Sequence, residues 1–326
     1  MNLSEPTYLP STEVVGANVV IFAIFDFISG TFIILANGFL LITIYRDPCR
    51  CLRTPYVFLI ANLSVADFLV GIVSILRGVE LTHFYRGLGS LLIVNLVQYF
   101  IGAVSILAAV STLLAMSYER YVAVIKPFQY PHKITNKKSK IAIAVIWING
   151  LIMSVLPIAD VKRENFLLAY CYSHFVIPAF ILTAVYVKIS RAVARQREEL
   201  KNVRESLTAA NRRKQLEKEN RMFRAFVFIL SIFYVSFVPY FIHVQILYFC
   251  SCRNSYAYHV YYYVANEFLT ISSIINPFLY AWRLPKFSRS FHSWFGGWLV
   301  KNSGARYNEN PPGQKETVTG SNSQLP

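Results

Sequence analysis

The sequence contains few charged residues for its length. Only 15% of its 326 residues are Asp, Glu, Lys or Arg, whereas 55% are hydrophobic. None of these four residue types occurs over residues 87–118, 141–159 or 225–252. A soluble domain of this size carries more charge, and about 20 apolar residues are enough for a helix to cross a bilayer. The scarcity of charge therefore argues against a soluble domain and predicts a membrane protein.

The sequence also lacks the features of two other protein classes. Ser, His, Asp and Glu do not gather at one depth of the apolar segments, so we expect no enzyme activity. We find neither an internal repeat nor the paired interrupted segments that many transporters have. A transporter that moves an ion past Asp67 and Glu267 is nevertheless the alternative function, because both acids lie inside apolar segments.

Seven apolar segments are each long enough to span a membrane as a helix. They cover residues 18–45, 55–78, 88–120, 139–159, 167–190, 221–249 and 257–282. We therefore predict an all-α membrane protein built as a bundle of seven transmembrane helices. We assign residues 1–17 to an extracellular N-terminus, 18–295 to the helical domain and 296–326 to a disordered cytoplasmic tail.

The positive charge is concentrated on one side of the predicted bundle. With the N-terminus outside, 27 of the 32 Lys and Arg residues lie on the inner face, in the connections and the tail. Basic inner connections are the usual orientation signal of membrane proteins, and they attract anionic lipids. The net charge of +15 therefore indicates a multi-pass protein of the plasma membrane that contacts inner-leaflet lipids, and not a nucleic-acid-binding protein.

Asp67 is an acid in the middle of the second apolar segment. Ionisable side chains inside a membrane usually have a function. With Ser273 and Asn276 of the seventh segment and Asn37 of the first, Asp67 is a candidate site for a sodium ion or a proton. The alternative is a protonated carboxyl group that forms hydrogen bonds in the core. We expect no other cofactor and no other metal.

Glu119, Arg120 and Tyr121 end the third segment at its inner edge. Glu219 begins the sixth segment at the same depth, so Arg120 can pair with both glutamates. Breaking a partly buried ion pair costs more than breaking an exposed one. We therefore predict that these residues hold two inner helix ends together. The alternative is a charge pair that faces lipid headgroups.

Prolines interrupt the sixth and seventh segments. Proline removes one backbone hydrogen bond and bends a helix, and nearby polar groups can replace the lost bond within a membrane. Bent helices with aromatic neighbours suit parts of a protein that move, although ordinary core packing is the simpler explanation. The residues at these two bends are Phe233, Phe237, Pro239, Asn276, Pro277 and Tyr280.

Together these motifs resemble the rhodopsin-like (class A) family of G-protein-coupled receptors over about residues 18–295. Residues 285–295 resemble the short amphipathic helix that follows the seventh span of that family. The other matching residues are Asn37, Asn62 to Asp67, Glu119 to Tyr121, Pro127, Phe128, Trp147, Pro157, Pro178, Tyr186, Phe233, Pro239 and Asn276 to Tyr280.

The resemblance implies that an extracellular ligand moves the sixth helix outward and so activates a heterotrimeric G protein. Arg120 would then contact the G-protein α subunit, and Phe128 would enter a pocket on that protein. Tyr186 and Tyr280 would stabilise the open state. The Ser and Thr residues of the tail would be phosphorylated by a receptor kinase and recruit arrestin.

The resemblance also restricts the ligand. Gly102 and Thr270 stand where relatives carry an amine-binding Asp and a retinal-binding Lys, which argues against an amine and against retinal. A peptide, a lipid or another small molecule is left. The predicted pocket residues are Arg77, Gln98, Tyr99, Tyr240, His243, Tyr263, Asn266 and Glu267.

Three ionisable residues near the pocket have open interpretations. Arg77 either binds an anionic group of the ligand or extends to the lipid headgroups. Asp26 and Glu267 either share a proton or bind a cationic ligand. The tyrosines of residues 256–263 are interpreted as an aromatic belt at the membrane interface.

The cysteines depart from the family pattern. The family usually has a cysteine at the outer end of the third span, where this sequence has Asn95. In lacking this cysteine, the sequence resembles the melanocortin, cannabinoid and lysolipid receptors. We predict a disulfide between Cys171 and either Cys250 or Cys252, because a bond between Cys250 and Cys252 would close a very tight ring.

Overall fold

The computed structural model describes residues 12–47, 50, 52–88, 91–155, 163–201 and 207–283. These residues are almost entirely helical, and no strand occurs among them. The predicted amphipathic helix at 285–295, the tail at 296–326 and Pro157 lie outside the described residues. The side chains of Glu219 and Tyr280 also lie outside what the structure describes.

Among the described residues, seven long helical stretches make up the bundle. Six of them contain a segment that is long and apolar enough to span a membrane, and α9, which carries Glu267 and Asn276, is less apolar. The stretches are α1 (Thr12–Arg46), α2 (Pro55–Tyr85), α3 (Leu92–Ile125), α5 (Asn136–Val155), a fifth composed of α6 (Arg163–Cys171), η3 (Tyr172–Val176) and α7 (Ile177–Lys201), then α8 (Leu207–Phe249) and α9 (Tyr256–Arg283). The short helices are η1 (Pro127–Gln129), α4 (Tyr130–Lys133) and η4 (Ser251–Asn254).

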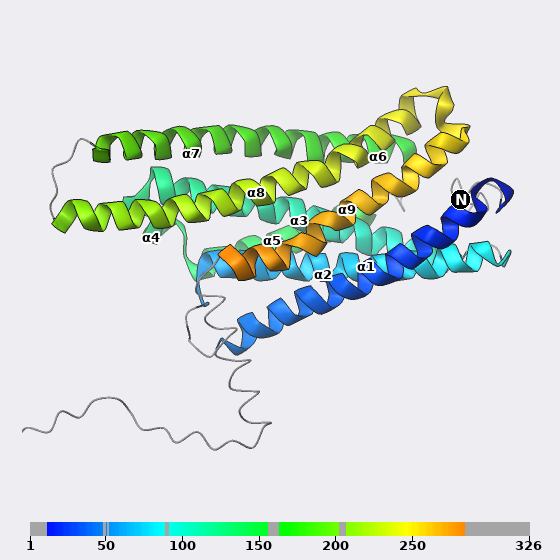
Figure 1. Ribbon diagram of the computed structural model, residues 1–326, viewed down its shortest axis with the longest axis horizontal. Coiled ribbons are helices and arrows are strands. Elements are labelled where there is room, and N and C mark those ends of the chain that lie inside the picture. The colour runs from blue at the N-terminus through cyan, green and yellow to red at the C-terminus, as the bar shows by residue number, and fades with distance from the viewer. Residues whose placement is uncertain are drawn as a thin grey trace, which may run out of the picture.

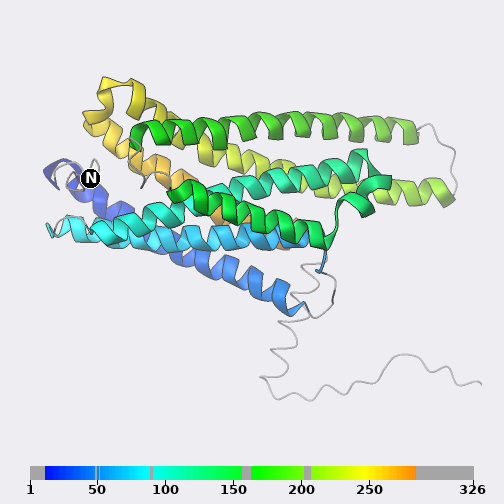
Figure 2. The ribbon, with the colours of Figure 1, turned by 180° about the vertical axis from the view of Figure 1, so that it is seen from behind.

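The long helices lie side by side along the length of the molecule (Figure 1). The start of α1 and the connection from α8 to α9 lie at one end, which we call the outer end. At the opposite, inner end, α7 and α8 extend past the other helices, as the view from behind also shows (Figure 2). The pairs α1 with α2, α2 with α3 and α8 with α9 pack most extensively.

The exposed faces of the bundle are apolar and its interior contains polar groups. On α1, Ile21, Ile28 and Leu35 are exposed, whereas Asp26 and Asn37 are fully buried. Apolar residues on the outside are favoured when lipid, and not water, surrounds the helices. Polar residues in the interior are usually functional in such a protein. This arrangement identifies the bundle as a multi-pass membrane fold.

Two glycines let α1 and α2 approach closely. A Cβ atom placed on Gly30 would lie 2.8 Å from the backbone oxygen of Gly71, which is closer than real contacts allow. Small residues at helix contacts allow this kind of packing in membranes. The close contact fixes the position of α2, which carries several residues of the site described below.

The fifth stretch changes its hydrogen-bond pattern ahead of a proline. Residues Tyr172–Val176 form a π-helical turn, and the Ile177 N–H donates to the Tyr172 carbonyl. Pro178 follows and cannot donate to the carbonyl four residues earlier, at His174. A single π turn inserts an extra residue and so accommodates this lost bond.

Candidate functional site

A cavity of about 580 Å³ lies between the helices. Seven of the eight predicted pocket residues line it, and Glu267 does not. The sequence interpretation missed Glu80, because the predicted second segment ended at residue 78, before that acid. It also missed Tyr258 and Tyr262, which belong to the tyrosine-rich stretch interpreted as a membrane belt. The polar and aromatic lining residues are Asp67, Ser74, Arg77, Glu80, Asn95, Gln98, Tyr99, Tyr170, Phe237, Tyr240, His243, Tyr258, His259, Tyr262, Tyr263, Asn266, Thr270, Ser272 and Ser273.

Glu80 forms a polar wall of the cavity together with two amides of α3. It is 8% exposed, and its two carboxylate oxygens accept hydrogen bonds from different side chains. Asn95 Nδ2 donates to Oε1, and Gln98 Nε2 donates to Oε2 at 2.9 Å. Asn95 is the residue that replaces the family cysteine. It therefore joins α3 to α2 in this chain.

Arg77 binds two acids from other helices. Its Nε donates to Asp26 Oδ2 at 2.8 Å, and Nη2 also contacts the Asp26 carboxylate. Nη2 also donates to Glu267 Oε1 at 2.6 Å. The two acids were predicted to share a proton or to bind a cationic ligand, and Arg77 to bind an anion or reach the headgroups. The structure shows a pairing that these interpretations did not include, because Arg77 itself contacts both acids.

Aromatic side chains of α8 and α9 form another part of the cavity wall. The His243 ring lies 4.9 Å from the Tyr262 ring between centroids, and His243 Nδ1 is 3.1 Å from the Tyr258 hydroxyl. Tyr263 is 3% exposed. Among the residues that the structure describes, its hydroxyl has no hydrogen-bond partner.

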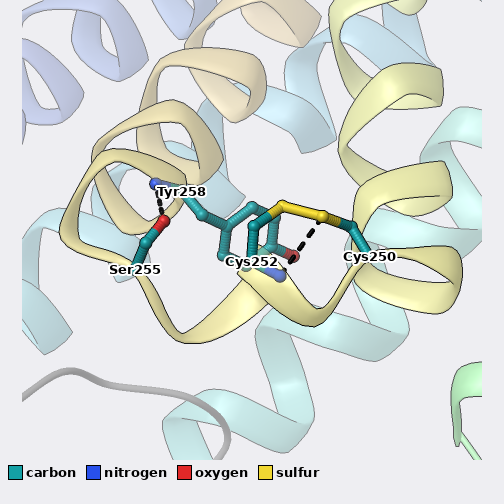
Figure 3. The surroundings of a disulfide bond; sticks show 4 residues. All are labelled: Cys250, Cys252, Ser255 and Tyr258. Atoms are coloured by element: carbon teal, nitrogen blue, oxygen red, sulfur yellow. Dashed lines mark hydrogen bonds between the residues drawn. A yellow bond between two sulfur atoms is a disulfide. The ribbon is translucent and has the colours of Figure 1, made fainter.

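The disulfide links Cys250 to Cys252, and the predicted bond to Cys171 was wrong (Figure 3). A short 3₁₀ helix brings the two Cα atoms to 5.1 Å, within the usual range for a disulfide. Cys171 is buried between helices and is not bonded. Three residues after the bridge, the Ser255 hydroxyl accepts from the Tyr258 N–H at 3.2 Å at the start of α9 (Figure 3).

Asp67 lies at the base of the cavity and contacts α9. Oδ1 accepts from the Ser273 hydroxyl at 2.7 Å, and Oδ2 accepts from Asn276 Nδ2 at 2.8 Å. The Asn37 amide donates to the Ser273 carbonyl at 3.0 Å, and its Oδ1 has no partner among the described residues. All three residues that sequence analysis grouped with Asp67 thus lie together at this point.

At the inner end, Arg120 and Glu119 form an ion pair that groups of α2 and α4 contact. Arg120 Nη2 donates to Glu119 Oε1 at 2.5 Å, and the Tyr130 hydroxyl of α4 donates to the same oxygen at 2.5 Å. The guanidinium lies 4.5 Å from the Tyr56 ring centroid of α2. Arg120 and Glu119 are both buried, and the predicted partner Glu219 has a side chain outside the described residues.

Aromatic contacts join the fifth stretch to α8. Phe233 and Phe237 lie 4.5 Å apart between ring centroids, and Phe175 stacks on Phe237 at 5.5 Å, directly before Pro239. Nearer the inner end, Tyr186 of α7 stacks on Phe223 of α8 at 5.5 Å. Both contacts would change if the inner part of α8 moved.

Two further predicted residues lie near the inner end. Phe128 of η1 is 95% exposed. Tyr121 is partly buried and packs against the cluster of Val124, Ile189 and Val193. Pro277 lies inside α9, which continues through it to Arg283.

Comparisons with known proteins match this arrangement. A family model described as 7 transmembrane receptor (rhodopsin family) matches residues 36–172 and 158–280. Trace amine-associated receptor 6 of Pan troglodytes is 27% identical over 324 residues, covering 90% of each chain. Lysophosphatidic acid receptor 1-A of Xenopus laevis is 25% identical over 280 residues, covering 80% of this chain and 71% of that receptor. Squid rhodopsin has a similar fold, with a TM-score of 0.72 at 20% identity over 90% of this chain and 89% of its own.

The chain therefore belongs to the rhodopsin family of seven-transmembrane receptors. The predicted family and the predicted seven-helix fold are both confirmed. Its relatives are receptors and not enzymes, as expected from the sequence. The alternative of an ion or solute transporter finds no support in these relatives.

Proposed function

We propose that this receptor converts the binding of an extracellular ligand in the 580 Å³ cavity into activation of a heterotrimeric G protein. The main support is that one helix, α8, contributes both to the cavity and to the packing at the inner end. The cavity is lined by Tyr240 and His243 of α8, and the inner part of the same helix packs near the buried Arg120 region. A ligand that binds two arrangements of α8 with different affinity would shift their populations.

The inner half of α8 would move outward in the active state. In the structure, Arg120 is held by Glu119, with Tyr130 and Tyr56 nearby. Outward movement would separate Tyr186 from Phe223 and open the inner end to the G-protein α subunit. Phe128 is 95% exposed, so a partner that covers its ring there would remove apolar surface from water, which is favourable.

The remaining partners are proposed from the sequence and the family. The N-terminus would lie outside the plasma membrane, and the basic inner connections would contact anionic lipids. A receptor kinase and arrestin would act on the tail, which lies outside the described residues. The names of the relatives refer to different ligands, a trace amine and lysophosphatidic acid, so they do not choose one for this chain.

A sodium ion at Asp67 is also proposed. The available donors are oxygens, namely the Asp67 carboxylate, the Ser273 hydroxyl and the buried Asn37 Oδ1, and hard cations prefer such ligands. The Asn276 amide already donates to Asp67 and would orient the carboxylate. When bound, the ion would supply a positive charge that balances Asp67 between α2 and α9.

The decisive experiment is G-protein activation measured across all α-subunit classes in cells that express the chain. Activity would be recorded without stimulation and with panels of peptides, lipids and small molecules. We expect at least one class to respond, and Arg120→Ala to abolish the response at equal surface expression. A response that persists in Arg120→Ala, or silence of every α-subunit class with every panel, would contradict the proposal.

A further inference from the structure

We infer that the cavity takes an organic cation, with Glu80 as its charged anchor; this rests on the proposed function, since the same cavity holds the ligand. Recognition would combine a carboxylate on α2 with aromatic rings on α8 and α9. The neighbouring amides Asn95 and Gln98 already orient the carboxylate. A charged ligand group placed beside it would gain a charge-assisted hydrogen bond.

The charged residues around the cavity favour a positively charged ligand. Among the described lining residues, Arg77 is the one Lys or Arg side chain, and it is bound by both Asp26 and Glu267. An anionic ligand would have to compete with these two buried carboxylates for Arg77 and would also meet Glu80. Because electrostatic interactions are strong where water is excluded, this arrangement disfavours anions and favours cations.

The aromatic wall adds a second, independent contribution. Tyr262 and His243 have ring centroids 4.9 Å apart, and the Tyr262 and Tyr263 rings meet edge to face at 5.3 Å. Faces of aromatic rings attract cations, and several rings around one site form the cages that bind organic ammonium groups. The Tyr263 hydroxyl, which has no hydrogen-bond partner within the described part of the chain, is buried at the cavity, where a ligand acceptor or donor would satisfy it.

The sequence argued against an amine because Gly102 occupies the α3 position of the expected aspartate. The structure shows that this argument concerns one position only, since Glu80 reaches the cavity from α2 instead. The absence of a side chain at Gly102 leaves room there. A Cβ atom at Gly102 would lie 3.8 Å from Val73, an ordinary contact.

That room allows a direct test with a reporter cysteine, Gly102→Cys, in the full-length receptor. Its rate of modification would be measured with two methanethiosulfonate reagents, one carrying trimethylammonium and one carrying sulfonate, each normalised to its rate with free cysteine. The unmodified receptor gives the background from its own five cysteines, of which Cys171 is buried and Cys250 and Cys252 are bonded together. We expect the cationic reagent to react faster by roughly tenfold or more, as charged clefts concentrate ions of opposite sign.

Glu80→Gln in the same background should remove most of that preference while it preserves the shape of the side chain. Glu199→Gln is the matched control, because Glu199 is half exposed on α7 and pairs with Arg195. It should leave the preference unchanged. Equal normalised rates for the two reagents, or a preference that Glu80→Gln leaves intact, would overturn the inference.

A second measurement does not depend on any Glu80 variant. Phenylethylammonium, 2-phenylethanol and phenylacetate share one ring and differ in charge, and each would be tested for protecting the introduced thiol from uncharged methyl methanethiosulfonate. We expect protection by the ammonium compound at a concentration about tenfold or more below that of the other two. Equal protection by all three, or none by the ammonium compound, would refute the inference.

These tests are independent of signalling. A cavity that selects cations in a chain that activates no G protein would retain the inference and reject the proposed function. A G-protein response to anionic or neutral ligands, with no cation preference, would support the proposed function and reject the inference.

Discussion

Arg77 Nη2 lies 2.6 Å from Glu267 Oε1, although the two residues are separated by 190 positions in the chain. The same guanidinium also binds the buried Asp26, so one side chain of α2 joins α1 and α9. From the sequence, Arg77 is interpreted separately from Asp26 and Glu267, whereas in the structure the three groups form one unit. Arg77 also lines the cavity, so the unit stabilises the packing of α1, α2 and α9 beside it.

Replacing Arg77 should destabilise the receptor strongly. Arg77→Met leaves Asp26 and Glu267 without their cation in a largely buried environment, which costs about 3–5 kcal/mol. Glu267→Gln should cost less, because Arg77 keeps both contacts to Asp26. Thermal unfolding of the purified receptors would measure the two effects. Equal melting temperatures for Arg77→Met and the unmodified receptor would show that the unit does not hold the helices together.

Weakening the contacts of Arg120 should raise basal signalling. Glu119→Gln removes the carboxylate charge that binds the guanidinium, whereas Tyr130→Phe removes one hydrogen bond to the same oxygen. A hydrogen bond to a charged group is worth about 1.5–3 kcal/mol. Glu119→Gln weakens the bonds from both Arg120 and Tyr130, whereas Tyr130→Phe loses only its own, so Glu119→Gln should have the larger effect. Basal G-protein activation at matched surface expression would measure it. A decrease in both variants would mean that Glu119 supports the active state instead.

Glu219→Ala tests the predicted second partner of Arg120. We expect it to raise basal signalling as well, if the inner ends of α3 and α8 are joined by this acid. The double variant Glu119→Gln/Glu219→Ala should then differ from the sum of the single effects, since residues in one network are not additive. If the effects of the two single variants simply add, Glu219 does not belong to the network of contacts around Arg120.

The disulfide assignment can be checked by alkylation and mass spectrometry of the intact receptor. The peptide that contains Cys250 and Cys252 should be alkylated after denaturation only when a reductant is present. Cys171 should be alkylated after denaturation without reductant, because it is not bonded. A peptide that links Cys171 to either of the other two cysteines would restore the pairing predicted from the sequence.

The contact of α1 with α2 should be sensitive to a single methyl group. Gly30→Ala would place Cβ 2.8 Å from the Gly71 backbone oxygen, and overpacking of this kind costs about 1–3 kcal/mol. Gly38→Ala is the control on the same helix, since its Cβ would lie 3.5 Å from Phe68, an ordinary contact. Melting temperatures should fall for Gly30→Ala and stay close to the original for Gly38→Ala. The reverse order would contradict the close helix contact.

The fold class, the seven-helix architecture and the pairing of Arg120 with Glu119 were predictable from the amino-acid sequence. Apolar segments of spanning length report directly on helices in a membrane, because backbone groups in lipid must form their hydrogen bonds within the helix. Motifs such as Glu119-Arg120-Tyr121 are contiguous, so they are visible without knowledge of the fold. The grouping of Asp67 with Ser273 and Asn276 is also predictable, because polar side chains in apolar segments are stabilised by hydrogen bonds to one another.

The pairing of the ionisable groups and of the cysteines follows from how the helices pack against one another. Arg77 could reach headgroups, ligand or acids equally well from its position in the sequence, and only the packing of α1 and α9 against α2 selected the acids. Cys171 is turned into the bundle, while a short turn brings Cys250 to Cys252. Glu80 lines the cavity because α2 continues to Tyr85, about two turns beyond the predicted end at residue 78. Each of these outcomes depends on distances between separate helices, which the order of residues does not contain.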